Sequence, residues 1–150
     1  MKLAVALQER SNLQQKVSEL DLRLRLNATY QEDEKPAEDI SALLKELEEA
    51  LGRLEVLIAR IHKTNLLTEV EGKSLTELLA RREVLTLKRR SLVQLSDEAS
   101  SLTPRHGRSE IKVYPSVDVS ALRKNIDKVS KELREIEMLI QEANWTTELK

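Results

Sequence analysis

An aliphatic residue returns every three or four positions along two long stretches of this chain. The first set is Ile40, Leu44, Leu47, Leu51, Leu54, Ile58 and Ile61. The second set is Val119, Leu122, Ile126, Val129, Leu133, Ile136, Ile140 and Ala143. Because an α-helix returns to one face about every 3.6 residues, each set forms a single stripe along a helix. Such spacing is typical of helices that pair by knobs-into-holes packing, so the chain is predicted to be all-α.

The composition supports long helices with narrow apolar stripes. Of the 150 residues 34% are charged, and the apolar ones are aliphatic, with no Phe, one Trp and two Tyr. This composition is typical of coiled coils and elongated helical bundles. Since one chain would bury little core, we expect a homo-oligomer, most simply a two-fold dimer.

Four helices are predicted, over about 2–26, 37–63, 75–99 and 118–144. Their similar lengths and modest connections favour antiparallel packing in a single helical domain over residues 1–150. Ser74 and Glu77 have the spacing of a capping box at the start of the third helix, and Glu71-Gly72-Lys73 is the expected turn before it. The last connection contains Pro104 and Gly107.

A short extended segment is expected near residues 108–117. Ile111, Val113 and Val117 alternate there with polar residues, and Pro115 interrupts the row. This pattern predicts an edge strand over Glu110–Tyr114, which would seek a partner such as its own symmetry mate. The tail from Trp145 onward is predicted to be non-helical.

Arg82 and Arg89 interrupt the apolar stripe of the third helix, which runs through Leu78, Leu85 and Leu92. One interpretation is a buried cationic ladder that binds an anion or a partner carboxylate. A second is that both heads reach water while other apolar residues complete the core. A third is that the two arginines set the register of helix pairing at a cost in stability.

A basic region spans residues 81–112, and an acidic segment spans residues 32–55. Its cations are Arg81, Arg82, Lys88, Arg89, Arg90, Arg105, Arg108 and Lys112. Nucleic-acid-binding proteins use such clusters on phosphates. No aromatic residue is interleaved to stack on bases, however, so this interpretation ranks second. Pairing of the second and third helices, within or between chains, accounts for both charge biases.

No catalytic, cofactor or metal site is predicted. The absence of cysteine excludes disulfides, thiol catalysis and cysteine-based zinc sites. His62 and His106 lack the glutamate three residues away that carboxylate-bridged metal sites in helical bundles use. The acidic residues near Glu48 suit a solvated helix face. A non-enzymatic role is therefore favoured over an enzymatic one.

Two further features bear on partners and location. Trp145 is expected to pin the tail to a neighbouring helix or to act as an interface hot spot. The apolar run at the N-terminus stops at Gln8, and no stretch has the roughly eighteen apolar residues that a membrane span requires. We therefore expect a cytoplasmic location and no membrane association.

Several stretches together resemble an uncharacterised bacterial family whose members are often labelled "septicolysin". They are Met1–Arg10, Leu79–Arg82, Arg108–Lys112, Val117–Val119 with Leu122–Lys124, and Ile140–Gln141 with Asn144–Leu149. The resemblance implies an all-helical cytoplasmic protein of unknown function, and it supplies no active-site residues. The family label implies a membrane-active toxin.

These observations rank three functions. The first is a non-enzymatic, self-associating assembly or adaptor module, with or without a further protein partner. The second is a nucleic-acid- or anion-associated factor that uses residues 81–112, and the remote third is the toxin of the family label. The candidate interface or anion-binding residues are Arg82, Arg89, Arg90, Arg105, Arg108, Lys112 and Trp145.

Overall fold

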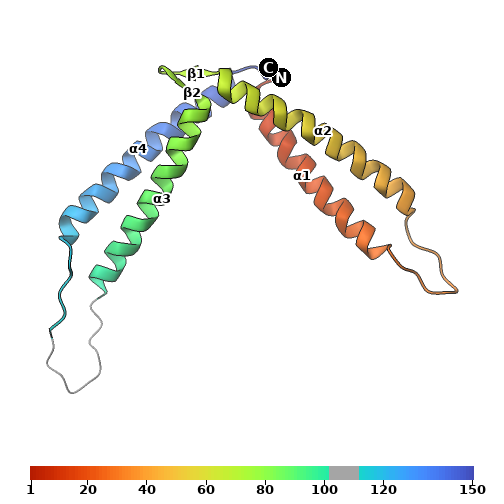
Figure 1. The fold of residues 1–150 in the computed structure, drawn as a ribbon, viewed down its shortest axis with the longest axis horizontal. Helices are drawn as coiled ribbons and strands as arrows, with labels where there is room; N and C mark the ends of the chain where they lie inside the picture. Colours follow the sequence, from red (N-terminus) through yellow and green to blue (C-terminus); the bar gives the residue numbers. More distant parts are fainter. Residues whose placement is uncertain (102–111) are drawn as a thin grey trace. The chain divides into compact units, whose positions relative to one another are not determined.

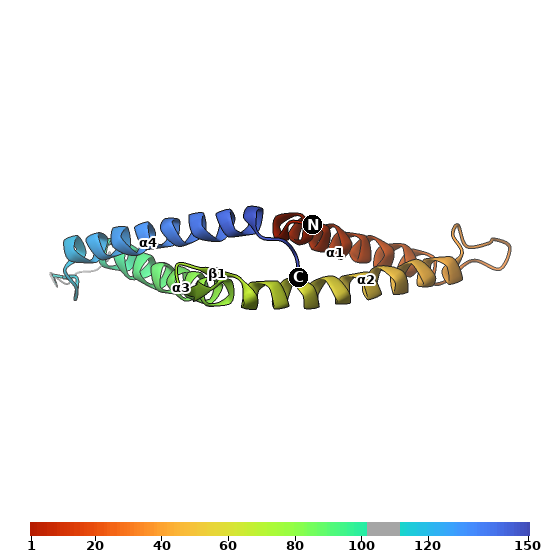
Figure 2. The same ribbon diagram turned by 90° about the horizontal axis from the view of Figure 1, so that it is seen from above.

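The protein is all-α, as predicted (Figures 1 and 2). A computed structural model describes residues 1–101 and 112–150. The helices are α1 (Leu3–Leu26), α2 (Ile40–Leu67), α3 (Leu75–Ser100) and α4 (Val119–Thr146), with a small sheet of β1 (Glu69–Val70) and β2 (Lys73–Ser74).

Helix α2 is shifted toward the C-terminus relative to its predicted range of 37–63. It begins after Asp39, whose carboxylate caps it by accepting a hydrogen bond from the Ser41 amide. It ends about one turn later than expected. Thr64, which was assigned to the connection, lies within the helix, where its side chain is buried and its hydroxyl donates to the Arg60 carbonyl at 2.8 Å.

The chain divides into two compact units, each built around a helical hairpin. Unit 1 contains residues 1–74 and 142–150, and unit 2 contains residues 75–141. Helices α1 and α2 lie side by side in unit 1, and α3 and α4 do so in unit 2 (Figures 1 and 2). The single domain expected over 1–150 stays a prediction.

The core of unit 1 uses a different face of α2 from the predicted one. Helix α1 buries Leu3, Ala6, Leu13 and Leu20, and α2 buries Leu43, Ala50, Leu57, Ile61 and Thr64. Of the predicted α2 stripe only Ile61 is fully buried, whereas Leu44 and Leu51 are exposed. The face toward α1 is thus centred on the residues that precede the predicted ones by one position. The small side chains of Ala6 and Ala50 let the two backbones approach closely.

The loop between α1 and α2 is tied at both of its ends. Asn27 donates to the Arg23 carbonyl at 2.9 Å and accepts from the Glu38 amide at 3.0 Å. The Arg23 guanidinium pairs with the Glu38 carboxylate through Nε and Nη2. Together these bonds fix where the chain leaves α1 and where it enters α2.

Both ends of the chain belong to unit 1, where they pair as a two-stranded clasp. The Leu3 amide donates to the Thr147 carbonyl at 2.9 Å, and the Leu149 amide donates to the Met1 carbonyl at 2.8 Å. The Lys150 amide then donates to the Thr64 hydroxyl at 2.9 Å, which attaches the tail to α2. The residue buried by this clasp is Leu149, with 8% of its surface exposed.

Trp145 does not pin the tail, contrary to prediction. It lies within the last turn of α4 and remains 64% exposed. The helix runs on to Thr146, whose hydroxyl donates to the Glu142 carbonyl at 2.8 Å. Backbone pairing of residues 147–150, which the sequence pattern did not reveal, anchors the tail instead.

The connection from α2 to α3 is a tight β-hairpin. Glu69 pairs with Ser74 and Val70 with Lys73, and the central residues Glu71 and Gly72 both have positive φ, at 50° and 79°. Positive φ at both central positions defines a type I′ turn, which matches the twist of the flanking strands. The turn was predicted at this place, but the strand pair was not. Helix α3 begins directly after Ser74, as the capping-box spacing indicated.

Unit 2 confirms the α4 stripe. Leu122, Val129, Ile136 and Ile140 are buried on α4, opposite Leu75, Leu78, Leu85 and Ser96 of α3. Residues 112–114 lie in neither strand nor helix of the single chain. The edge strand expected over Glu110–Tyr114, with a symmetry mate as its partner, stays a prediction. Glu110 and Ile111 lie outside the described residues, as does most of the extended segment expected near 108–117.

The clasp predicts that truncating Leu149 destabilises the protein far more than truncating Trp145, four residues earlier. Leu149→Ala should lower the free energy of unfolding by about 2 kcal/mol, because it removes a buried side chain and leaves a cavity. Trp145→Ala removes a larger but exposed side chain and should change it by less than about 0.5 kcal/mol. Urea denaturation followed by circular dichroism measures both, and equal losses would contradict the burial.

The ion pair between Arg23 and Glu38 predicts that the stability of the fold depends on pH. The hydrogen bond from Arg23 lowers the pKa of the Glu38 carboxyl below its ordinary value. Because the folded-state pKa is depressed, this contribution to stability is present above the unfolded-state pKa and is lost as pH falls through the folded-state pKa. Between about pH 5 and pH 3, Glu38→Gln should therefore lose less stability than the wild type. Glu34→Gln, the same change at an exposed loop position, should keep the wild-type slope.

Candidate functional site

Three of the four arginines of α3 contact polar side chains of α4 within unit 2. Arg82 pairs with Glu137 at 3.2 Å, Arg81 pairs with Glu132 at 2.7 Å, and Arg89 donates to the Ser130 hydroxyl at 2.8 Å. The pKa of the Glu137 carboxyl is lowered, first by the hydrogen bond from Gln141 and then by the bond from Arg82. Arg82 is half-buried and Arg89 is exposed, so the buried cationic ladder is wrong. Both heads reach polar groups of α4 at the edge of the core, whereas the second interpretation expected them to reach water.

The remaining candidates of the basic region do not gather into one site. Arg90 and Lys112 are exposed, and neither they nor Lys88 form an ion pair within residues 1–101 and 112–150. Arg105 and Arg108 lie outside the described residues. Since Arg81 and Arg82 pair with carboxylates of α4, the cations of the described part of the basic region that have no ion pair there are Lys88, Arg90 and Lys112, while Arg89 donates to Ser130.

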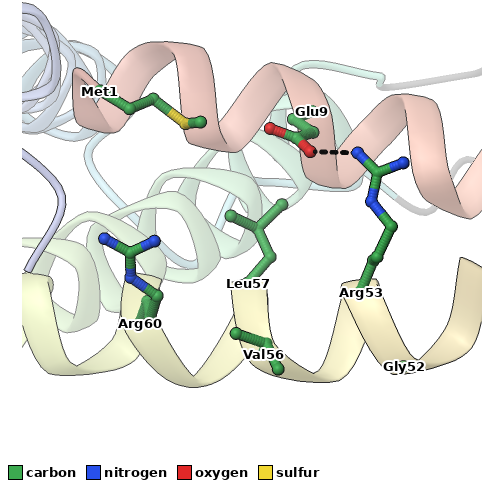
Figure 3. Close-up of a pocket in the computed structure, with 7 residues that line it drawn as sticks. All are labelled: Met1, Glu9, Gly52, Arg53, Val56, Leu57 and Arg60. Atoms are coloured by element: carbon green, nitrogen blue, oxygen red, sulfur yellow. Dashed lines mark hydrogen bonds and ion pairs between the residues drawn. The ribbon is translucent and has the colours of Figure 1, made fainter.

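A hollow of about 310 Å³ opens between α1 and α2 in unit 1 (Figure 3). Its charged residues are already bound: Arg53 pairs with Glu9 at 2.9 Å, and Arg60 donates to the carbonyls of Leu149 and Lys150 at 3.4 and 3.3 Å. Met1, Val56 and Leu57 form its apolar wall, and a Cβ added at Gly52 would meet no atom within 4 Å. The hollow therefore holds a structural ion pair rather than an acid–base pair directed at a ligand.

No group of three or more histidine or acidic residues that could hold a metal ion occurs in the described ranges. His62 lies alone on α2, and His106 lies outside these ranges. None of the described helices is both long enough and apolar enough to cross a membrane.

The exposed apolar surface of α2 is a more informative feature. Leu44 and Leu51 are 48% and 39% exposed, and Leu54 and Ile58 are half-buried beside them. We call these four residues the α2 outer stripe. Leu51, Leu54, Ile58 and Ala59 line a shallow groove of about 510 Å³ together with Glu55 and His62, all of them on α2. Its apolar character fits the side chains of another helix.

Helix α3 carries a second apolar stripe on the side away from α4. Val84, Leu87 and Leu95 are 56%, 47% and 47% exposed, and with Ala80 they share one helical face, on which Ser91 occupies the position between Leu87 and Leu95. We call these four apolar residues the α3 outer stripe. It was missed in the sequence because the stripe through Leu78 and Leu85 had already been assigned to the core. A search for two apolar faces on one helix would have found it.

Comparison with known proteins identifies the family. The sequence profile of a family of unknown function, DUF6847, matches residues 10–149. The chain belongs to the DUF6847 family. A similar solved structure is the crystal structure of a functionally unknown conserved protein from Corynebacterium diphtheriae, which is 40% identical, has a TM-score of 0.93, and covers 100% of this chain and 99% of its own. No match was found among curated proteins. The resemblance of this DUF6847 member to septicolysin-labelled proteins stays a prediction.

The edge position of the α3 arginines predicts that they are dispensable for the fold. Arg82→Leu combined with Arg89→Leu removes one exposed ion pair and one hydrogen bond, together worth no more than about 1 kcal/mol, and adds apolar surface at the α4 contact. Helical content should be unchanged, and the melting temperature should not fall. A marked loss of helix by circular dichroism would support the interpretation in which the arginines set the register.

Proposed function

We propose that this protein is a non-enzymatic helical assembly module that self-associates through its exposed apolar faces. The observation that carries the proposal is the α2 outer stripe, which continues the apolar face of α2 beyond the part that α1 covers. Two exposed leucines seven residues apart, with an adjoining apolar groove on the same helix, form the kind of surface that helix-in-groove and coiled-coil contacts use.

Two further considerations support an assembly role. The charged residues of the hollow and of the α3–α4 edge satisfy one another, which leaves little converging chemistry for a substrate. The chain also lacks cysteine, so its stability needs no oxidising compartment, and the proposal places it in the cytoplasm.

The mass in solution tests self-association. At micromolar concentration, light scattering coupled to gel filtration should give twice the 17.2 kDa of one chain. Leu51→Glu should give the mass of a single chain, because it places a charge in the centre of the apolar contact. Val56→Glu is the matched control, since Val56 is equally apolar and 60% exposed on α2 but lies outside the outer stripe. A monomeric wild type would overturn the proposal.

A further inference from the structure

We propose that the partner of the α2 outer stripe is the α3 outer stripe of a second copy, packed antiparallel to it. The inference rests on the proposed function and specifies its interface. Both stripes are apolar: the α2 outer stripe flanks the face that α1 covers, with Leu44 and Leu51 exposed, and the α3 outer stripe lies on the exposed side of α3 away from α4.

The α2 outer stripe is bordered by acids. Glu48 and Glu55 lie seven residues apart along the edge of the stripe that faces away from α1, and His62 continues the same row. Neither glutamate forms an ion pair within the described parts of the chain. Glu55 and His62 also line the apolar groove, so these polar groups would meet whatever covers the groove.

The α3 outer stripe is bordered by cations at the matching spacing. Arg81 and Lys88 are seven residues apart along one edge of the stripe. Arg81 is held by Glu132 but has donors to spare on its guanidinium, and Lys88 has no ion pair among the described residues. The other edge carries one charge of each sign, Glu83 and Arg90. Residues in these border positions set partner choice and orientation in paired helices.

One antiparallel register satisfies the apolar and the charged residues together. Placing Leu51 opposite Leu87 brings Leu54 opposite Val84 and Ile58 opposite Ala80. The same register sets Glu48 beside Lys88 and Glu55 beside Arg81. The apolar layers and the ion pairs therefore agree on one alignment, which is what specifies a unique pairing of two helices.

Charge also disfavours the simplest alternative partner of the α2 outer stripe, which is the same stripe of a second copy. If two α2 outer stripes packed against each other, four glutamates would line the contact with His62 and its copy as the only polar counterparts in the row. Like charges at such close range destabilise helix pairing. The α3 outer stripe instead offers cations opposite each glutamate.

Cysteine cross-linking tests the register directly, because the wild type contains no cysteine. Leu51→Cys and Leu87→Cys proteins, distinguished by a tag on one of them, are mixed and oxidised. The proposal expects a mixed disulfide as the main covalent product. Leu51→Cys mixed with Met138→Cys is the control, because Met138 is 72% exposed on α4 and lies outside both stripes.

Three results would overturn the inference. The first is a disulfide between two Leu51→Cys chains as the main product. The second is that Leu51→Cys forms a disulfide with Met138→Cys as fast as with Leu87→Cys. The third is a disulfide within one chain in a protein that carries both Leu51→Cys and Leu87→Cys. If the wild type is dimeric but any of these appears, self-association stands and this interface falls. A monomeric wild type would contradict both self-association and this interface.

Charge reversal supplies an independent readout. Glu48→Lys should weaken dimerisation by about fivefold or more, the equivalent of about 1 kcal/mol, because it faces Lys88 of the partner with a like charge. Adding Lys88→Glu to the same chain should restore the wild-type dissociation constant. Glu49→Lys, the same change at an exposed α2 position off the stripe, should have little effect. Failure of Lys88→Glu to rescue would contradict the pairing.

Discussion

The apolar face of α2 is wider than the surface that α1 covers, and the proposed self-association depends on this mismatch. Leu43, Ala50 and Leu57 pack into unit 1, while Leu44 and Leu51, one position further along each turn, face outward. A helix with an apolar stripe of ordinary width is satisfied by one neighbour. Because α2 carries further apolar side chains on one side of that stripe, the free energy of burial favours a second neighbour.

The charged residues also fall into two groups: some pair within a unit, and others, within the described ranges, lie unpaired beside the outer stripes. Within unit 1 the pairs Arg23–Glu38 and Arg53–Glu9 join α1 to the start and the middle of the α2 segment. Within unit 2 the pairs Arg81–Glu132 and Arg82–Glu137 join α3 to α4. Exposed pairs of this kind add little stability individually. Glu48, Glu55 and Lys88 form no such pair among the described residues, and they lie at the borders of the outer stripes.

Helical periodicity predicted most of the fold, because it reports directly which residues share a face. It placed all four helices and the buried stripe of α4. It could not decide which half of the wide α2 face α1 would take, because Leu43 and Leu44 fit the same period equally well. It also could not find the clasp, since backbone bonds between Leu3, Thr147 and Leu149 leave no side-chain pattern. Of the candidate sites, the sequence showed that Arg82 and Arg89 were unusual, but not that their partners lay on α4.

The central claim is that the α2 outer stripe is covered in solution by another copy of the chain. Methyl resonances of Leu51 and Met138, recorded with a soluble paramagnetic agent across a dilution series, test it most directly. Leu51 should be protected at high concentration and become as broadened as Met138 on dilution, while Met138 should be broadened throughout. Leu51 methyls that are equally broadened at every concentration would contradict the account.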